Sequence, residues 1–375
     1  MSSITVTCVE TRHQKKQFLS LPWQLHREDP NWIPPLRMNQ KEMVGYKHHP
    51  FYDDAEIQTF LTMRDGGVCG RIGAIVNHAH NRRYKDETGF FGFFESVDDQ
   101  EVADSLFDAA GQWLKDRGMT TIRGPMNPSF NYEIGLLIEG FDSPPTFMMT
   151  YNPPFYEKLI DNYGFEKEQD LFAFWGHIDM LETQDTKLQF IVDEATRRFN
   201  FDLRRMNISK LDEEVRTFLR IYNDANGNHW GFVPLSESEI KHMSKSMRFL
   251  MAPEMTALAE VDGRVVGVAF GMLDFNPRIK QIDGRLFPFG FLKLMMNRKA
   301  IKRVRLIATH VVPEYQRWGL GLVLLSRLVP DVKAWGIEEG EFSWVAESNH
   351  LSRASLERGG AKRDKTYRIY DYKIK

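Results

Sequence analysis

The chain has 375 residues, which is long for one domain and comfortable for two. Its 49 basic and 51 acidic side chains leave a net charge of −2, so charge gives no global argument for binding nucleic acid or an anionic membrane. Two cysteines, Cys8 and Cys69, are too few for a disulfide framework or a Cys-rich metal site, and we expect both to be inert core residues. The polar N-terminus and the absence of a long apolar run predict a cytoplasmic protein.

The first half of the chain has the pattern of a sheet with an amphipathic helix. The expected elements are, in chain order, a hairpin Glu56–Asn77 with its turn at Asp65-Gly66-Gly67, a strand Phe90–Val97, a helix Glu101–Arg117 that Gly118 ends, and a strand Leu171–Ile178. A charged helical run, Leu181–Asn200, is expected to link this half to the next.

The second half repeats this plan and adds a turn. The expected elements are a strand Phe201–Ile208, a hairpin Met255–Leu273 with its turn at Asp262-Gly263, a strand Leu306–Val312, a helix carrying Leu322, Leu325 and Leu328, a strand Glu341–Glu347, and a short helix ending at Gly359-Gly360-Ala361. The turn before the first of these helices contains Gln316, Gly319 and Gly321 in a Q-x-x-G-x-G pattern.

This glycine turn is a candidate phosphate site. A strand that leads through glycines into a helix leaves backbone N–H groups unpaired beside the positive end of the helix dipole, and both favour an anion. The dinucleotide fingerprint fails because Leu324 stands at the third glycine position, and no Gly-Lys-Ser/Thr follows. A plain strand-to-helix turn is the alternative.

The surrounding sequence resembles the GNAT superfamily of CoA-dependent N-acyltransferases. The resemblance rests on V-x-P-x-x-x-x-x-G-x-G-x-x-L, here Val311 to Leu324, and on the block NHLSRASLERGGA that begins at Asn349. It implies an α+β fold of two tandem GNAT-like domains, each a mixed, mostly antiparallel sheet flanked by helices. We expect a degenerate N-terminal domain over residues 1–182, a linker helix over 183–200, and a CoA-binding domain over 201–375.

Longer phrases are similar to a narrower group of tandem GNAT-like bacterial proteins that includes bacterial ceramide synthases, which acylate a sphingoid amine. The phrases are NWIPPLRM (Asn31–Met38), GPMNPSFNYEIGLLIEGFDSPP (Gly124–Pro145), HWGFVPL (His229–Leu235) and GRLFPFGFLKL (Gly284–Leu294). This similarity spans nearly the whole chain and implies long-chain acyl or lipid-amine chemistry.

The resemblance assigns acetyl-CoA or a longer acyl-CoA as cosubstrate, without a metal. The residues it implies for binding are Val311, Val312, Gln316, Arg317, Trp318, Gly319, Leu320, Gly321 and Asn349. The backbone N–H that polarises the thioester carbonyl falls among His310, Val311 and Val312.

The catalytic side chains are less determined. Four groups compete as the base that takes the amine's proton: His310, Glu347, His350 and His229. Leu356 stands where family members often carry a tyrosine that protonates the thiolate, and Tyr367 or Tyr370 are candidates to replace it. The alternative for each of these side chains is a purely structural or solvated role.

The first half lacks the phosphate turn. Asp98, Asp99 and Glu101 occupy the corresponding place, and carboxylates there repel a pyrophosphate. We therefore expect only the C-terminal half to hold CoA, with the first half shaping the substrate side or serving as a structural support.

The segment Arg285–Arg305 is a second unusual feature, because it contains seven basic residues and no acidic one. Its first part is rich in Phe, Leu and Met. Apolar anchors beside cations suit peripheral contact with the inner face of a membrane or an amphiphilic substrate, and the alternative is a packed helix with a basic end. Nucleic acid is disfavoured as a partner.

These observations predict an N-acyltransferase that moves an acyl group from acyl-CoA to a small-molecule or lipid primary amine by direct attack. The alternative is a non-catalytic GNAT-like protein that senses CoA or lipid.

Overall fold

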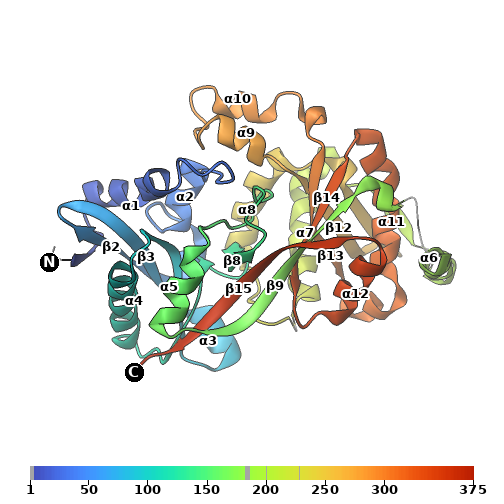
Figure 1. The fold of residues 1–375 in the computed structure, drawn as a ribbon. Helices are drawn as coiled ribbons and strands as arrows, with labels where there is room; N and C mark the ends of the chain where they lie inside the picture. Colours follow the sequence, from blue (N-terminus) through green and yellow to red (C-terminus); the bar gives the residue numbers. More distant parts are fainter. Residues whose placement is uncertain (1–3, 182–185, 200, 228) are drawn as a thin grey trace. The chain divides into compact units, whose positions relative to one another are not determined.

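The computed structural model describes residues 4–181, 186–199, 201–227 and 229–375 (Figure 1). The chain forms two compact units. The first comprises Met1–Leu171, Asn276–Met296 and Lys365–Lys375, and the second comprises Phe172–Phe275 and Asn297–Asp364. The predicted boundaries at residues 182 and 200 stay a prediction, but the contact division places two later segments of the chain with the first unit.

The first unit is built on a mostly antiparallel sheet with the strand order β1-β2-β3-β4-β5-β15. Its strands are β1 (Ile4–Cys8), β2 (Ala55–Arg64), β3 (Gly67–Asn77), β4 (Thr88–Ser96), β5 (Thr121–Gly124), β6 (Met126–Asn127), β7 (Glu133–Ile134), β8 (Leu136–Glu139) and parts of β9 (Glu166–His177) and β15 (Lys362–Lys373). Its helices are α1 (Arg12–Leu25), α2 (Arg37–Met43), α3 (His78–Tyr84), α4 (Gln100–Lys115), α5 (Phe155–Tyr163), α9 (Asn276–Gln281) and α10 (Gly290–Met295).

Helices cover both faces of this sheet. Successive residues of a strand point to opposite faces, and β3 shows the consequence. Ile72 packs into the core cluster with Leu106 and Phe107 of α4, whereas Arg71 donates a hydrogen bond from Nη1 to the carbonyl of Phe18 in α1 at 2.7 Å. The apolar stripe predicted for α4 therefore forms the centre of the first core.

The second unit has the strand order β9-β14-β13-β12-β11-β10. Its own strands are β10 (Asp202–Arg204), β11 (Thr256–Val261), β12 (Arg264–Leu273), β13 (Arg303–Val311) and β14 (Glu339–Ala346). Its helices are α6 (Thr186–Phe199), α7 (Leu211–Ala225), α8 (Glu237–Leu250), α11 (Leu320–Trp335) and α12 (His350–Arg358).

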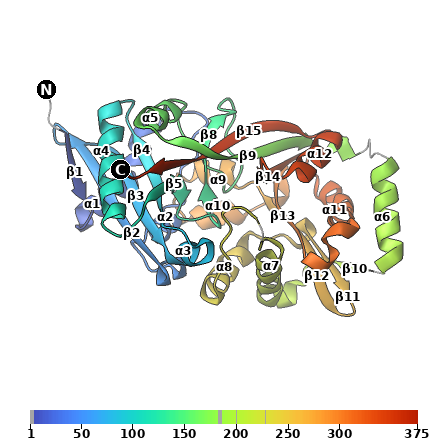
Figure 2. The same ribbon diagram turned by 90° about the horizontal axis from the view of Figure 1, so that it is seen from below.

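The strands β12 and β13 separate α7 from α11 (Figure 2). A Cβ on Gly267 of β12 would lie 3.0 Å from Leu324 in α11, so glycine here lets the helix approach the sheet closely. On the other face, Phe270 packs edge-to-face with Phe218 of α7 at 5.2 Å between ring centroids. Along β13, Thr309 lies next to Gly321 of α11 and His310 lies next to Tyr222 of α7.

The predicted hairpins are confirmed with their turns. Asp65 and Gly66 connect β2 to β3, Asp262 and Gly263 connect β11 to β12, and all four residues have positive φ. Such turns match the right-handed twist of the flanking strands. Each unit combines helices with mostly antiparallel strands, which confirms the predicted α+β class.

Two predictions about local structure are wrong. Cys8 is exposed and Cys69 is half-buried, so neither is a fully buried core residue. The strand expected over Phe201–Ile208 is only Asp202–Arg204, because the Met206 N–H donates to the Thr256 hydroxyl at 3.0 Å and Asn207 caps a short 3₁₀ turn. Over the described residues, no helix combines the length and apolar character needed to span a bilayer.

Candidate functional site

The strands β13 and β14 form a parallel pair that covers only part of their length. Arg303–Leu306 pair with Glu339–Phe342, and then β13 continues to Val311 and β14 to Ala346. The register between β12 and β13 shifts at Phe270/Gly271, because Ile307 is one extra residue on β13. A bulge bends its strand and increases the twist, so it lies where β13 departs from its parallel partner.

The hydrogen bonds of β13 distinguish among the backbone groups predicted to polarise a carbonyl. The Val312 N–H donates to the Val266 carbonyl at 3.0 Å. In an antiparallel pair the inward and outward N–H groups alternate, so His310 also faces β12 and Val311 faces the opposite edge. Val311 is therefore the member of the predicted set whose N–H points to the side of β14.

The predicted glycine turn lies directly after β13. A 3₁₀ turn, Pro313–Trp318, leads to Gly319, whose φ of +75° is in the left-handed region that favours glycine, and α11 begins at Leu320. Gln316 has a structural contact, since its Nε2 donates to the Val311 carbonyl at 3.0 Å. The side chains of Arg317 and Trp318 lie outside the described part of the structure.

The two glycines of the turn have different surroundings. A Cβ on Gly319 would lie 2.7 Å from Cγ2 of Ile191 in α6, so any side chain at this position would require Ile191 to shift. A Cβ on Gly321 would lie 3.4 Å from Cγ2 of Thr309, which is an ordinary contact. Gly321 is therefore the cleaner position at which to probe the turn. Leu320, fully buried, can offer only its backbone to a ligand.

Two of the predicted bases lie on the α7 side of β13. His310 packs edge-to-face against Tyr222 at 5.1 Å between ring centroids, and its Nδ1 lies 3.4 Å from Nδ2 of Asn226. Burial, with a smaller contribution from neighbouring His229, lowers the pKa of His310 to about 3. Burial also lowers the pKa of His229. Both imidazoles are therefore neutral near pH 7.

The Nε2 atom of His310 is buried and has no hydrogen-bond partner within the described part of the chain. A buried polar atom without a partner is costly, so it favours a ligand that supplies a hydrogen bond. The amide nitrogen of Asn226 can only donate, so Nδ1 of His310 is the acceptor and Nε2 carries the proton of the neutral imidazole. The unpartnered Nε2 N–H therefore favours a ligand atom that accepts a hydrogen bond.

The remaining predicted residues are more dispersed. Glu347 directly follows β14 and is half-buried, and His350, the first residue of α12, is exposed. Asn349 is the N-cap of α12, where its Oδ1 accepts from the Ser352 N–H at 3.2 Å. Tyr367 belongs to the first unit, where it is fully buried and pairs with Leu137.

The sequence interpretation missed a buried polar network at the point where β13 and β14 are still paired. Arg305 donates from Nε to the Ser343 hydroxyl at 2.8 Å, and that hydroxyl donates to Glu341 at 2.6 Å. All three side chains are buried. The available signal was the alternation of charged and apolar residues in both strands, which places polar side chains on one face.

In the first unit, the strand pair that corresponds to β13 and β14 has its open edge occupied by other residues of the chain. The β4 and β5 strands also form a parallel pair, at Thr88–Phe90 and Thr121–Arg123. Beyond it, the Phe93 N–H donates to Oδ1 of Asn127 at 2.6 Å, and a Cβ on Gly92 would lie 1.8 Å from the Met126 carbonyl oxygen.

The helix start beyond β4 carries its own anion. Asp99 is the N-cap of α4, accepting from the Val102 N–H at 3.2 Å, and Arg64 pairs with it at 2.7 Å. The hydrogen bond from Arg64 holds the pKa of Asp99 below its usual range. The N-terminus of α4 is thus satisfied by a carboxylate of the chain itself.

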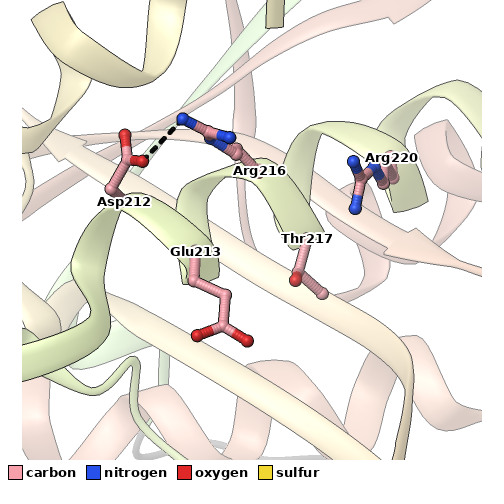
Figure 3. Close-up of a pocket in the computed structure, with 5 residues that line it drawn as sticks. All are labelled: Asp212, Glu213, Arg216, Thr217 and Arg220. Atoms are coloured by element: carbon pink, nitrogen blue, oxygen red, sulfur yellow. Dashed lines mark ion pairs between the residues drawn. The ribbon is translucent and has the colours of Figure 1, made fainter. Parts of the chain in front are cut away.

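One surface pocket lies on α7. It has a volume of about 250 Å³ and is lined by Asp212, Glu213, Arg216, Thr217 and Arg220 (Figure 3). Asp212 and Arg216 form an ion pair at 2.8 Å within it. The pocket contains none of the predicted site residues. The described residues include no group of three or more His, Cys, Asp or Glu that could hold a metal ion.

The solved structures that resemble the chain have the GNAT fold. A tandem GNAT protein from the clavulanic acid biosynthesis pathway aligns over 100% of this chain and 99% of its own, with a TM-score of 0.58 and 12% identity. A GCN5-related N-acetyltransferase from Anabaena variabilis aligns over 100% and 73%, with a TM-score of 0.53 and 8% identity. The fold is therefore that of the tandem GNAT proteins, as the sequence predicted.

Two proteins of similar sequence identify the family to which the chain belongs within this class. The bacterial ceramide synthase of Caulobacter vibrioides is 34% identical over 383 residues, covering 99% of this chain and 97% of its own. Protein YghO of Escherichia coli is 34% identical over 369 residues, covering 97% and 94%. No protein-family model matches the chain. The chain belongs to the tandem GNAT-like family of these two relatives, and this membership indicates an N-acyltransferase.

Proposed function

We propose that this protein transfers an acyl group from acyl-CoA to the primary amine of a lipid. The observation that carries the proposal is the partial parallel pair of β13 and β14, with the glycine turn and the start of α11 at the far end of β13. A separated strand edge offers backbone groups to the thioester arm, and a helix start offers N–H groups to the pyrophosphate.

Each step of the transfer has a candidate group in the second unit. The Val311 N–H polarises the thioester carbonyl, the backbone of Gly319–Gly321 holds the pyrophosphate, and Asn349 contacts the CoA arm. The amine nitrogen attacks the carbonyl carbon, the new C–N bond forms, and the C–S bond breaks to release the CoA thiolate. Direct attack is favoured over a covalent enzyme intermediate because Cys8 and Cys69 both lie in the first unit.

His310 is proposed to contact the substrate at the reacting centre and not to accept the amine's proton. Because Nδ1 faces the amide nitrogen of Asn226, Nε2 carries the proton and can donate a hydrogen bond to an acceptor atom of the bound substrate. Its low pKa makes this imidazole a poor acceptor for the amine's proton at neutral pH, so we assign that role to one of the other candidates, His229 or Glu347. His229, Glu347 and Tyr367 remain proposals for proton transfer to or from bulk solvent or the thiolate.

The first unit is proposed to shape the acceptor side and not to bind CoA. The Asp99 carboxylate at the start of α4 and the Asn127 contact with the Phe93 N–H support this division, because they occupy the positions that phosphate and thioester would need. The lipid nature of the acceptor is supported by the name of the 34% identical relative, a ceramide synthase. We place the reaction in the cytoplasm, at the inner face of the membrane.

One observation favours the alternative of a non-catalytic CoA or lipid sensor. Leu356, at the position where GNAT proteins often have a tyrosine, packs against the apolar cluster of Phe172, Phe174, Val345 and Ala361. No proton donor is then present at that position of α12.

A thiol-release assay separates the two functions. Purified protein is incubated with acetyl-CoA or palmitoyl-CoA, with and without a sphingoid amine, and free thiol is measured alongside calorimetric CoA binding. Thiol release that depends on the amine supports the enzyme. CoA binding without release supports the sensor, and the absence of both binding and release contradicts the proposal.

A further inference from the structure

Five large apolar side chains are exposed within ten residues around α10. Phe287 is 72% exposed, Phe289 68%, Phe291 39%, Leu292 56% and Met296 66%. These residues are called the α10 surface below. Single exposed apolar residues are ordinary, but a contiguous group of this size on a protein surface marks an interaction site.

The exposure of the α10 surface is imposed by a firmly held framework. Ile282 and Leu294 point inward and are buried, and Arg278 donates from Nη1 to the Leu294 carbonyl at 2.8 Å. A Cβ on Gly284 would lie 2.2 Å from the Pro35 carbonyl oxygen, so this segment sits directly on the backbone before α2. The buried side of this segment already has apolar residues, Ile282 and Leu294, that pack into the first unit. The exposed Phe, Leu and Met side chains of the α10 surface are therefore not needed for that packing.

Further contacts fasten the same segment to the first unit. Asn276 donates to the Pro145 carbonyl at 2.7 Å, and Trp23 donates from Nε1 to Asp283 at 2.6 Å. Arg37 pairs with Asp283 at 2.7 Å and stacks over the Trp23 ring at 4.0 Å. Figure 1 shows α9 and α10 together in this segment.

Charge beside the α10 surface is positive. Arg285 and Lys293 are exposed within it. The nearby acid, Asp283, pairs with Arg37 at 2.7 Å and with Arg285 at 3.5 Å, so these three side chains together keep one positive charge. An anionic surface therefore meets no uncompensated carboxylate in this segment.

The cations of the second part of Arg285–Arg305 contact residues of the second unit. Arg298 donates to the carbonyls of Leu250 and Met251, Lys299 lies over the Trp335 ring at 4.2 Å, and Arg305 is buried. Arg303 lies 3.9 Å from Glu339, and Lys302 lies 3.7 Å from Glu338. The contact division also assigns 297–305 to the second unit.

We infer that the α10 surface inserts into the headgroup region of a phospholipid bilayer that contains anionic lipid. Rigidly presented Phe, Leu and Met side chains flanked by exposed Arg and Lys match the requirements of interfacial insertion. The inference rests on the proposed function only in that a lipid acceptor resides in a membrane; bilayer binding itself needs neither CoA nor turnover.

Vesicle co-sedimentation of the full chain tests the inference. Wild type should sediment with vesicles of phosphatidylcholine and phosphatidylglycerol. Phe287→Ser combined with Phe289→Ser should weaken this binding at least about tenfold, because two rings that would leave water are removed. Phe190→Ser is the matched control, since Phe190 is 66% exposed on α6 and should leave binding unchanged.

Charge contributes a smaller part. Pure phosphatidylcholine vesicles should bind up to about thirtyfold more weakly, because roughly two exposed cations lose their anionic partners. Changing Lys299 and Lys302 to glutamine should leave vesicle binding unchanged.

Three results would overturn the inference. The first is a wild type that does not sediment with anionic vesicles. The second is a double serine variant that binds as well as wild type, or whose melting temperature falls enough to show that the rings support the fold. The third is a wild-type dimer in light scattering that the serine changes dissociate, since the surface would then cover a second copy of the chain. Failure of the thiol-release assay with intact vesicle binding would contradict the proposed function and leave this inference standing.

Discussion

Changing Gly321 to glutamate tests the glycine turn with little disturbance of the fold. Gly321 is the second residue of α11, where a carboxylate interacts favourably with the helix dipole by about 0.3–1 kcal/mol. The added Cβ meets Thr309 at an ordinary 3.4 Å. Two unit charges 4 Å apart interact by about 4 kcal/mol at the effective dielectric of a protein surface. A glutamate beside a pyrophosphate should therefore weaken CoA binding at least about a hundredfold.

Calorimetry with CoA provides the measurement, and Gly321→Gln is the control of equal size without the charge. We expect the glutamine variant to lose much less affinity than the glutamate variant, and both to melt within a few degrees of wild type. Gly319→Glu is also expected to abolish binding, but it forces a side chain against Ile191 and into a positive φ, so its effect mixes stability with binding. Unchanged CoA affinity in folded Gly321→Glu protein would refute the placement of the pyrophosphate at this turn.

Three further predictions concern the groups around the site. Asp99→Ala should reduce the free energy of unfolding by about 1–2 kcal/mol in urea titrations, because the α4 cap is lost. CoA affinity measured by calorimetry should stay the same, and altered affinity would contradict the proposal that only the second unit binds CoA. Because His310 has a folded pKa of about 3 and an ordinary unfolded pKa near 6.5, its contribution to stability is complete above about pH 6.5 and is lost as pH falls toward 3, by at most about 5 kcal/mol. His310→Gln should therefore show a smaller loss of stability between pH 7 and pH 5 in denaturant titrations, and an equal loss would argue against a buried neutral imidazole. Arg305→Met should destabilise the chain by about 3–5 kcal/mol, because Glu341 remains buried without this cation, and adding Glu341→Gln should recover part of the loss in thermal melts; a single variant as stable as wild type would contradict the buried network.

Features governed by neighbouring residues were predictable from the sequence. The Asp-Gly turns, the glycine after β13, and the apolar spacing of α4 and α11 depend on backbone preferences and on the period of the pattern, and all have the predicted form. The family phrases extended this local information to the tandem GNAT fold.

Features governed by partners distant in the chain were decided by tertiary structure. Arg305 is one of a run of cations in the sequence, yet pairing of β13 with β14 buries it against Ser343 and Glu341. Only the register with β12 shows that the Val311 N–H points away from β12, whereas the Val312 N–H donates to β12. The sequence alone determined that a glycine-containing turn joins a strand to a helix, because a turn needs only a few adjacent residues. Strand register and burial decide which backbone group, histidine or cation is accessible near that turn. Both depend on contacts between segments that are distant in the chain, and a local sequence pattern carries no information about such contacts.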